Sequence, residues 1–188
     1  PDTMVDRGCA VDPDDIRRVV VKKFYEIVID GKELADSRIR LIPSVDNLES
    51  CFYRKRFLLN TYVDALSFLA LDKGHSSLFE AVNDRELTQQ MVPYMKVVKQ
   101  SLITGFGMPP EEVDQWEARY RERNRQTAGS KRSLDSIARD MWRKLEYEAR
   151  FVKPVAQAMA GGCQVAKGAR VLAHPDAIHF RPGGLERD

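Results

Sequence analysis

The sequence has no apolar run long enough to cross a membrane. Its longest uninterrupted candidates, Val19–Val21 and Phe68–Leu71, fall far short of the roughly 18 residues that a membrane span needs. The first four residues, Pro-Asp-Thr-Met, do not form a basic region followed by an apolar stretch, so no secretory signal is expected. We therefore expect a cytoplasmic protein that has no membrane contact.

Cysteine and histidine are scarce. The three cysteines (Cys9, Cys51 and Cys163) are dispersed, and no pair has the spacing of a zinc site or a redox motif. An odd, scattered set is typical of free thiols in a reducing compartment. The three histidines have no cysteine or carboxylate at ligand spacing, so no metal site is expected at His75, His174 or His179.

The chain also lacks a charge excess of either sign. It has 30 Lys and Arg against 28 Asp and Glu, a formal net charge of +2. A protein that binds nucleic acid through the phosphate backbone usually has a more one-sided basic surface. The arginines at positions 119, 121, 123 and 125 have glutamates among them, which indicates a solvated helix face. Nucleic acid is therefore not an expected partner.

What the chain does have is helical periodicity. From Asp46 to Leu71, apolar residues recur at steps of three, four and seven, which predicts a long amphipathic helix. Runs at 19–21 and 24–29 predict one or two short strands, with a short helix from Pro13 as the alternative. Further helices are predicted over Ser76–Asn83, over Glu86–Ile103 with an interruption or bend near Pro93, over Pro109–Arg125 and, with a break near Lys153, over Ser133–Ala160. The predicted fold class is mainly α, with a few short N-terminal strands.

One lysine lies on the apolar stripe of the first long helix. Lys55 follows Leu48 by seven residues and Phe52 by three, so it must reach solvent, find a partner or line a cleft. Partial burial would lower its pKa and make it a base near neutral pH. Asn60 lies about 140° further round an ideal helix, where its amide can border the same groove and orient an oxygen. The alternative is a basic side chain that only covers apolar surface.

The segment around this lysine resembles the signature of the long-chain mannitol dehydrogenase family. Residues 53–61 read Tyr-Arg-Lys-Arg-Phe-Leu-Leu-Asn-Thr, with the family's spacing of a lysine, four residues and an asparagine. Three further segments match in the same order: Thr-Met-Val-Asp-Arg at 3–7, Asp-Lys-Gly-His at 72–75, and residues 139–154 with Arg-Lys-Leu and a closing Lys-Pro. The resemblance runs from residue 1 to about residue 161.

The resemblance implies a multi-helical domain like the C-terminal domain of 6-phosphogluconate dehydrogenase, preceded in the family by a Rossmann domain. Residues 1–10 would be the last piece of a missing Rossmann domain, residues 11–160 the helical substrate-binding domain, and residues 161–188 a loop-rich tail. No G-x-G-x-x-G follows a strand. NAD or NADP would therefore be bound mainly by a domain absent from this chain, which by itself is expected to be inactive.

The resemblance also implies roles for single residues in an NAD(P)-dependent polyol dehydrogenase that acts on a small polyol or hydroxy acid. Lys55 matches the family's general base, and Asn60 matches the residue that orients the reacting oxygen. Three more residues fall where the family contacts substrate hydroxyls or a phosphate: Asp6, Arg139 and Lys144.

The sequence departs from the family at two positions. Val63 stands where the family has a histidine, and a valine offers no hydrogen bond to a hydroxyl. Ser136 stands where the family often has a basic residue. The valine favours a smaller or less hydroxylated substrate, with a diverged enzyme of little activity as the alternative. The serine counts against a sugar-phosphate substrate. The alternative function is a helical interaction module derived from this family that no longer catalyses a reaction.

Overall fold

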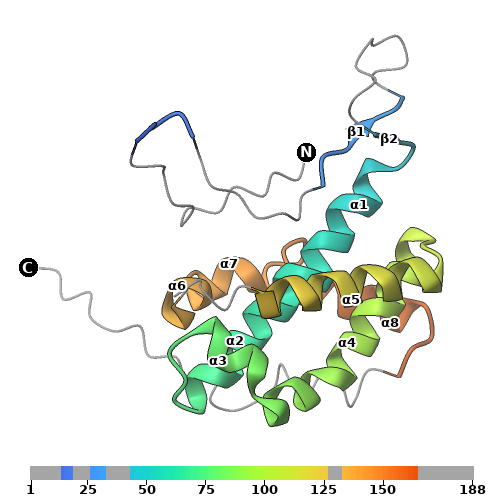
Figure 1. The fold of residues 1–188 in the computed structure, drawn as a ribbon. Helices are drawn as coiled ribbons and strands as arrows, with labels where there is room; N and C mark the ends of the chain where they lie inside the picture. The colour runs from blue at the N-terminus through green and yellow to red at the C-terminus, as the bar shows by residue number, and fades with distance from the viewer. Residues whose placement is uncertain (1–13, 19–25, 33–42, 127–132, 165–188) are drawn as a thin grey trace, which may run out of the picture. The chain divides into compact units, whose positions relative to one another are not determined.

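The computed structural model describes residues 14–18, 26–32, 43–126 and 133–164, drawn in colour in Figure 1. Within these residues the chain is mainly helical, and its regular strands are the two-residue β1 (Ile29–Asp30) and β2 (Ser44–Val45). The chain divides into two compact units, Pro1–Tyr53 and Arg54–Asp188. The predicted mainly α fold class with few strands is confirmed. The likeness to 6-phosphogluconate dehydrogenase and the three predicted domain ranges stay predictions.

The first unit holds the two strands and the start of the first long helix. The strands pair in parallel, with Ile29 opposite Ser44. Helix α1 (Leu48–Lys55) follows Asn47, whose side-chain oxygen accepts a hydrogen bond from the Ser50 backbone N–H at 3.0 Å, as N-cap residues do. Of the predicted strand runs, 19–21 and the first two residues of 24–29 lie outside the described residues.

In the second unit the long helix continues but changes its winding. A π-helical segment, η1 (Arg56–Thr61), separates α1 from α2 (Tyr62–Asp72), and the backbone stays right-handed helical on both sides. The predicted helix from Asp46 to Leu71 is therefore confirmed in extent, whereas regular α-helical spacing is wrong for residues 56–61. Most of α2 is buried, as expected of a helix that is apolar nearly all round.

Three helices follow: α3 (Leu78–Asn83), α4 (Arg85–Phe106) and α5 (Pro110–Gln126). Helix α2 packs against α3 and α4, while α5 packs against η1, α3 and α4 (Figure 1). Their predicted ranges are confirmed to within a few residues, and Pro93 lies inside α4 without ending it. The core of the unit consists of fully buried side chains from these helices, including Phe57, Leu66, Met91, Tyr94, Leu102, Val113 and Tyr120.

The predicted long helix over Ser133–Ala160, with a break near Lys153, is wrong in the number and the places of its breaks. Three short helices occupy it: α6 (Leu134–Ala138), α7 (Met141–Leu145) and α8 (Val152–Ala160). The first break falls at Asp140, whose φ of 59° is left-handed, and the second spans residues 146–151. Pro154 does not break a helix, because it lies in the first turn of α8, where a missing N–H leaves no intrahelical bond unmade.

Asp84 fixes the start of α4. Its side chain accepts hydrogen bonds from the backbone N–H groups of Glu86 (2.9 Å) and Leu87 (3.1 Å). Lys73 Nζ and His75 Nε2 each lie 2.9 Å from the same carboxylate. The side chains of Lys73 and His75, and then the Leu87 N–H, hold the pKa of Asp84 well below its ordinary value. His75 therefore has a structural partner, the Asp84 carboxylate, at the turn after α2.

We expect Asp84→Asn to destabilise the protein more at neutral pH than in acid. The folded-state pKa of Asp84 is depressed, so its stabilisation is present above the ordinary carboxyl pKa and is lost as the pH falls towards the folded value. Thermal unfolding of both proteins between pH 7 and pH 3 measures this, and the difference in Tm should narrow with acid. A difference that stays constant would contradict the assignment. Asp114→Asn, at an exposed ion pair with Lys99, is the control.

Candidate active site

The π-helical segment brings Lys55 and Asn60 to one side of the helix. In a π-helix each backbone hydrogen bond joins residue i to residue i+5, so residues five apart lie nearly above one another. Lys55 immediately precedes η1, and Asn60 is the fifth residue of η1. The two side chains therefore lie closer round the helix than the about 140° of an α-helix. Short π-helical segments are rare and are often found at functional sites.

Lys55 has the surroundings of a potential base. Its side chain is half-buried, as is that of Asn60. Burial lowers the pKa of the Lys55 ammonium, and the positive charge of Arg123 on α5 lowers it further. Both effects disfavour the charged form. Lys55 is therefore more easily deprotonated than an exposed lysine.

The basic run on α5 is only partly a solvated face. Arg119 and Arg125 are exposed, as predicted, but Arg121 and Arg123 are half-buried, so the prediction is wrong for these two. Arg121 lies over the Tyr62 ring, with its guanidinium carbon 5.4 Å from the ring centroid. Because α5 packs against η1, these two arginines add positive charge near the helix that carries Lys55.

We expect Arg123→Gln to raise the pKa of Lys55, because it removes a repulsive positive charge. The rate at which Lys55 reacts with an amine-acylating reagent, followed by peptide mass spectrometry over a pH series, reports this pKa in the chain itself. The half-maximal rate should move to higher pH. Arg125→Gln, two residues along the same helix and exposed, is the matched control and should leave the curve in place. Equal curves for all three proteins would exclude an effect of Arg123.

Val63, at the position where the family has a histidine, is buried in the protein. Val63 is 7% exposed, and its carbonyl oxygen accepts a hydrogen bond from the Ser67 hydroxyl at 2.6 Å. The preceding residue, Tyr62, is buried as well. In this structure Val63 is a core residue.

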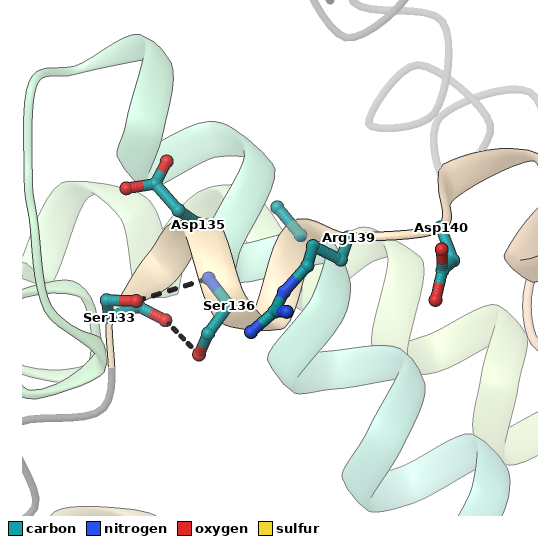
Figure 2. A pocket seen from close by; sticks show the side chains of 6 residues that line it. Ser133, Asp135, Ser136, Arg139 and Asp140 are labelled. Atoms are coloured by element: carbon teal, nitrogen blue, oxygen red, sulfur yellow. Dashed lines mark hydrogen bonds between the residues drawn. The ribbon is translucent and has the colours of Figure 1, made fainter. Parts of the chain in front are cut away.

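Arg139 lies at the C-terminal end of α6 and lines an open pocket of about 380 Å³. The other lining residues are Ser133, Asp135, Ser136, Ala138 and Asp140. In Figure 2, Arg139 extends back along α6 towards Ser136, while Asp135 points away from it. The two serines are engaged with each other: the Ser136 N–H donates to Ser133 Oγ at 3.2 Å, and Ser136 Oγ donates to the Ser133 carbonyl at 2.8 Å. The exposed guanidinium of Arg139 is accessible to a small anion or a hydroxyl.

Lys144 lies inside the domain. It is 3% exposed, its ammonium is 3.2 Å from Asp64 Oδ1, and it donates a hydrogen bond to the Ile137 carbonyl oxygen. The sequence interpretation missed Asp64, which is 2% exposed and also bonds to Arg150. The signal was present, since Asp64 is an acid within the otherwise apolar first turns of α2.

Some predicted residues lie outside the described parts of the chain: Asp6, Cys9, His174, His179 and the tail beyond residue 164. Cys163 is a free thiol, as expected. The described residues contain no cluster of three or more side chains suited to hold a metal ion. No helix in the described segments combines the length and apolar character that a bilayer-spanning helix requires.

Sequence comparison finds relatives over most of this chain, as the resemblance to the long-chain mannitol dehydrogenase family predicted. Its relatives are mannitol-1-phosphate 5-dehydrogenases. That of Halalkalibacterium halodurans is 29% identical over 167 residues, which are 87% of this chain and 44% of the relative. That of Podospora anserina is 26% identical over 182 residues, 95% of this chain and 45% of the relative. That of Arthrobacter sp. FB24 is 30% identical over 142 residues, 74% and 36%.

The chain thus spans less than half the length of these curated relatives, consistent with a C-terminal domain of the family. A search of family-wide sequence profiles found no match.

Proposed function

We propose that this chain is the substrate-binding and catalytic portion of an NAD(P)-dependent polyol dehydrogenase, with Lys55 as general base and Asn60 as the residue that orients the alcohol oxygen. The observation that carries the proposal is the π-helical segment between the two residues. This change of helical winding reduces the angle round the helix between the two side chains, which supports their acting on the same substrate oxygen. Homology to mannitol-1-phosphate 5-dehydrogenases supports the same reaction class.

The proposed chemistry divides between the two side chains. Lys55 Nζ, when neutral, accepts the proton of the substrate hydroxyl, and its lowered pKa increases the fraction of neutral amine near physiological pH. The Asn60 amide donates a hydrogen bond to the same oxygen, which holds it in place and stabilises the negative charge that develops there. NAD or NADP, when bound, accepts the hydride from the carbon.

The described residues do not fit a dinucleotide. Such a site in a Rossmann fold needs a glycine-rich turn between a strand and a helix, with the pyrophosphate at the helix N-terminus. The turn between β2 and α1 consists of Asp46 and Asn47 and contains no glycine. Gly105 and Gly107 lie at the end of α4, where Gly107 is the left-handed C-cap. We therefore propose that the dinucleotide is bound mainly by a Rossmann domain that this chain does not include.

The proposed substrate is a small polyol, its phosphate ester or a hydroxy acid. Arg139, exposed in the pocket of Figure 2, is suited to contact a phosphate, a carboxylate or neighbouring hydroxyls. Asp6 is proposed as a second contact to substrate hydroxyls, on the family resemblance alone. Burial of Val63 leaves the position of the family's histidine without a polar group, which favours fewer hydroxyl contacts.

The second candidate is a helical interaction module without catalysis. Two observations favour it. Val63 is a buried valine at the position of the family's histidine, and the aromatic side chains of Trp142 and Tyr147 are 85% and 53% exposed. Large apolar side chains that are left exposed are one feature of surfaces that bind other proteins.

The test joins this chain to the portion of the Halalkalibacterium halodurans relative that the chain does not span. Reduction of NAD and NADP is then measured with a panel of polyols, polyol phosphates and hydroxy acids. We expect turnover in the joined protein and none in either part alone. A joined protein that is folded and binds the dinucleotide, yet turns over no member of the panel, would favour the interaction module.

A further inference from the structure

A buried ion cluster that the proposed reaction does not use lies against α2. Asp64 Oδ1 is 3.2 Å from Lys144 Nζ, and Asp64 Oδ2 accepts a hydrogen bond from Arg150 Nη1. Lys144 also donates to the Ile137 carbonyl oxygen and lies 5.8 Å from the centre of the Phe68 ring. One carboxylate thus serves two cations, and both Asp64 and Lys144 are closed to water.

The cluster borders a buried phenol on α4. Tyr94 is fully buried, and its hydroxyl has no hydrogen-bond partner among the described residues. Burial raises the pKa of the Tyr94 phenol, and the charge of Asp64 raises it further, so this group stays neutral. The counter-charge for Lys144 and Arg150 inside the domain is therefore supplied by Asp64.

Lys144 lies in the last turn of α7 and Arg150 lies between α7 and α8, and both pair with Asp64 of α2. Arg56 Nη1 donates to the Glu148 carbonyl oxygen at 2.7 Å. Thr61 Oγ1 lies 3.0 Å from the Arg150 carbonyl oxygen and donates to it. Three residues of η1 and α2 therefore bind the segment between α7 and α8 or the end of α7: Arg56, Thr61 and Asp64. Asp64 is the one that binds two side chains at once, and it lies one helical turn beyond Asn60.

We infer that Asp64 is a positioning residue: by binding Lys144 and Arg150, it fixes the segment from Arg139 to Arg150 against the helix that carries Lys55 and Asn60. The inference rests on the proposed function. It names the residue that holds Arg139, a proposed substrate contact, in place relative to Lys55 and Asn60, the proposed catalytic pair. It gives Lys144 an internal role, because its ammonium is already bound by Asp64 and Ile137. Arg139 is then the cation that remains for a substrate.

The double variant Asp64→Asn/Lys144→Met distinguishes the loss of the Asp64–Lys144 contact from a change in the net charge of the cluster. It removes one negative and one positive charge together, so the cluster keeps the single excess positive charge of Arg150. The matched control is Asp114→Asn/Lys99→Met, which removes the ion pair between exposed Asp114 on α5 and half-buried Lys99 on α4, together with the contact of Lys99 to Glu117. If the double variant fails to fold, Asp64→Glu, which keeps the charge but lengthens the side chain, replaces it.

The first readout is hydrogen exchange in the chain itself. We expect the amides of residues 141–151 to exchange about tenfold faster or more in the double variant, while α4 keeps its protection, because local opening is governed by the contacts of that segment. The control should match the parent chain throughout. Unchanged protection of residues 141–151 would overturn the inference, whatever the enzyme does.

The second readout is the kinetics of the joined protein. We expect kcat/KM to fall about tenfold or more, mainly through KM, since small displacements of substrate contacts reduce rates strongly. The pH dependence of kcat should be unchanged, because the surroundings of Lys55 are intact. Faster exchange with unaltered kinetics would also overturn the inference. Absence of turnover in the unmutated joined protein counts against the proposed function, and hydrogen exchange then still decides whether Asp64 holds the segment.

Discussion

Replacing Lys55 with methionine is expected to lower kcat of the joined protein by a factor of about 10²–10⁴, the usual contribution of a general base. Methionine has nearly the length of lysine but accepts no proton, so it fills the half-buried space without the chemistry. The measurement is NAD or NADP reduction at saturating substrate, with the fold monitored by thermal unfolding.

The pH dependence makes this prediction specific. Only the neutral amine accepts a proton, so turnover of the parent protein should decrease as the pH falls below the pKa of Lys55. That pKa lies below the ordinary lysine value because of burial and Arg123. The residual activity of Lys55→Met should show no such decrease.

Lys96→Met is the matched control, because Lys96 is an exposed lysine on α4. It should leave both kcat and its pH dependence as in the parent protein. Turnover that survives in Lys55→Met with the same pH dependence would exclude Lys55 as the base.

Much of the helical arrangement was predictable because its signals are local. Ser77 and Glu80 form a capping box at the start of α3, with the Ser77 hydroxyl accepting from the Glu80 N–H and the Glu80 carboxylate accepting from the Ser77 N–H. Asp84 caps α4, and Gly107 ends it in the left-handed conformation. Each signal lies within a few residues of the helix end that it determines.

The two errors have non-local causes. Nothing in Arg-Phe-Leu-Leu-Asn-Thr distinguishes a π-helical turn from an α-helical one, whereas in the folded chain this segment packs against α4 and α5. The segment Ser133–Ala160 has helical periodicity, yet residues 146–151 are held in turns by Arg56, Thr61 and Asp64, about 90 positions earlier. Tertiary contacts of this kind override local propensity.

In the candidate site, too, local signals were predictive and long-range contacts were not. Lys55 was identified because a lysine on an apolar stripe is a local anomaly, and its half-burial and lowered pKa agree with that interpretation. The internal position of Lys144 has a non-local cause, since it depends on the contact with Asp64, which is 80 positions earlier in the chain, and on the turn at Asp140.

Removing the charge of Asp64 alone is expected to cause a large loss of stability. Asp64→Asn leaves the buried ammonium of Lys144 and the guanidinium of Arg150 without their counter-charge. Breaking a buried ion pair by removal of one partner typically costs about 3–5 kcal/mol of unfolding free energy. Urea unfolding at pH 7, with linear extrapolation to water, measures the difference from the parent chain.

The double variant identifies the source of that loss. Asp64→Asn/Lys144→Met removes the uncompensated ammonium as well, so its unfolding free energy should exceed that of Asp64→Asn, although it lacks one more native side chain. Asp114→Asn, at an exposed pair, should change stability by less than about 1 kcal/mol. A loss below about 1 kcal/mol for Asp64→Asn would mean that water or a partner group compensates the two cations. The Asp64 contacts would then contribute too little free energy to hold residues 146–151 in one position.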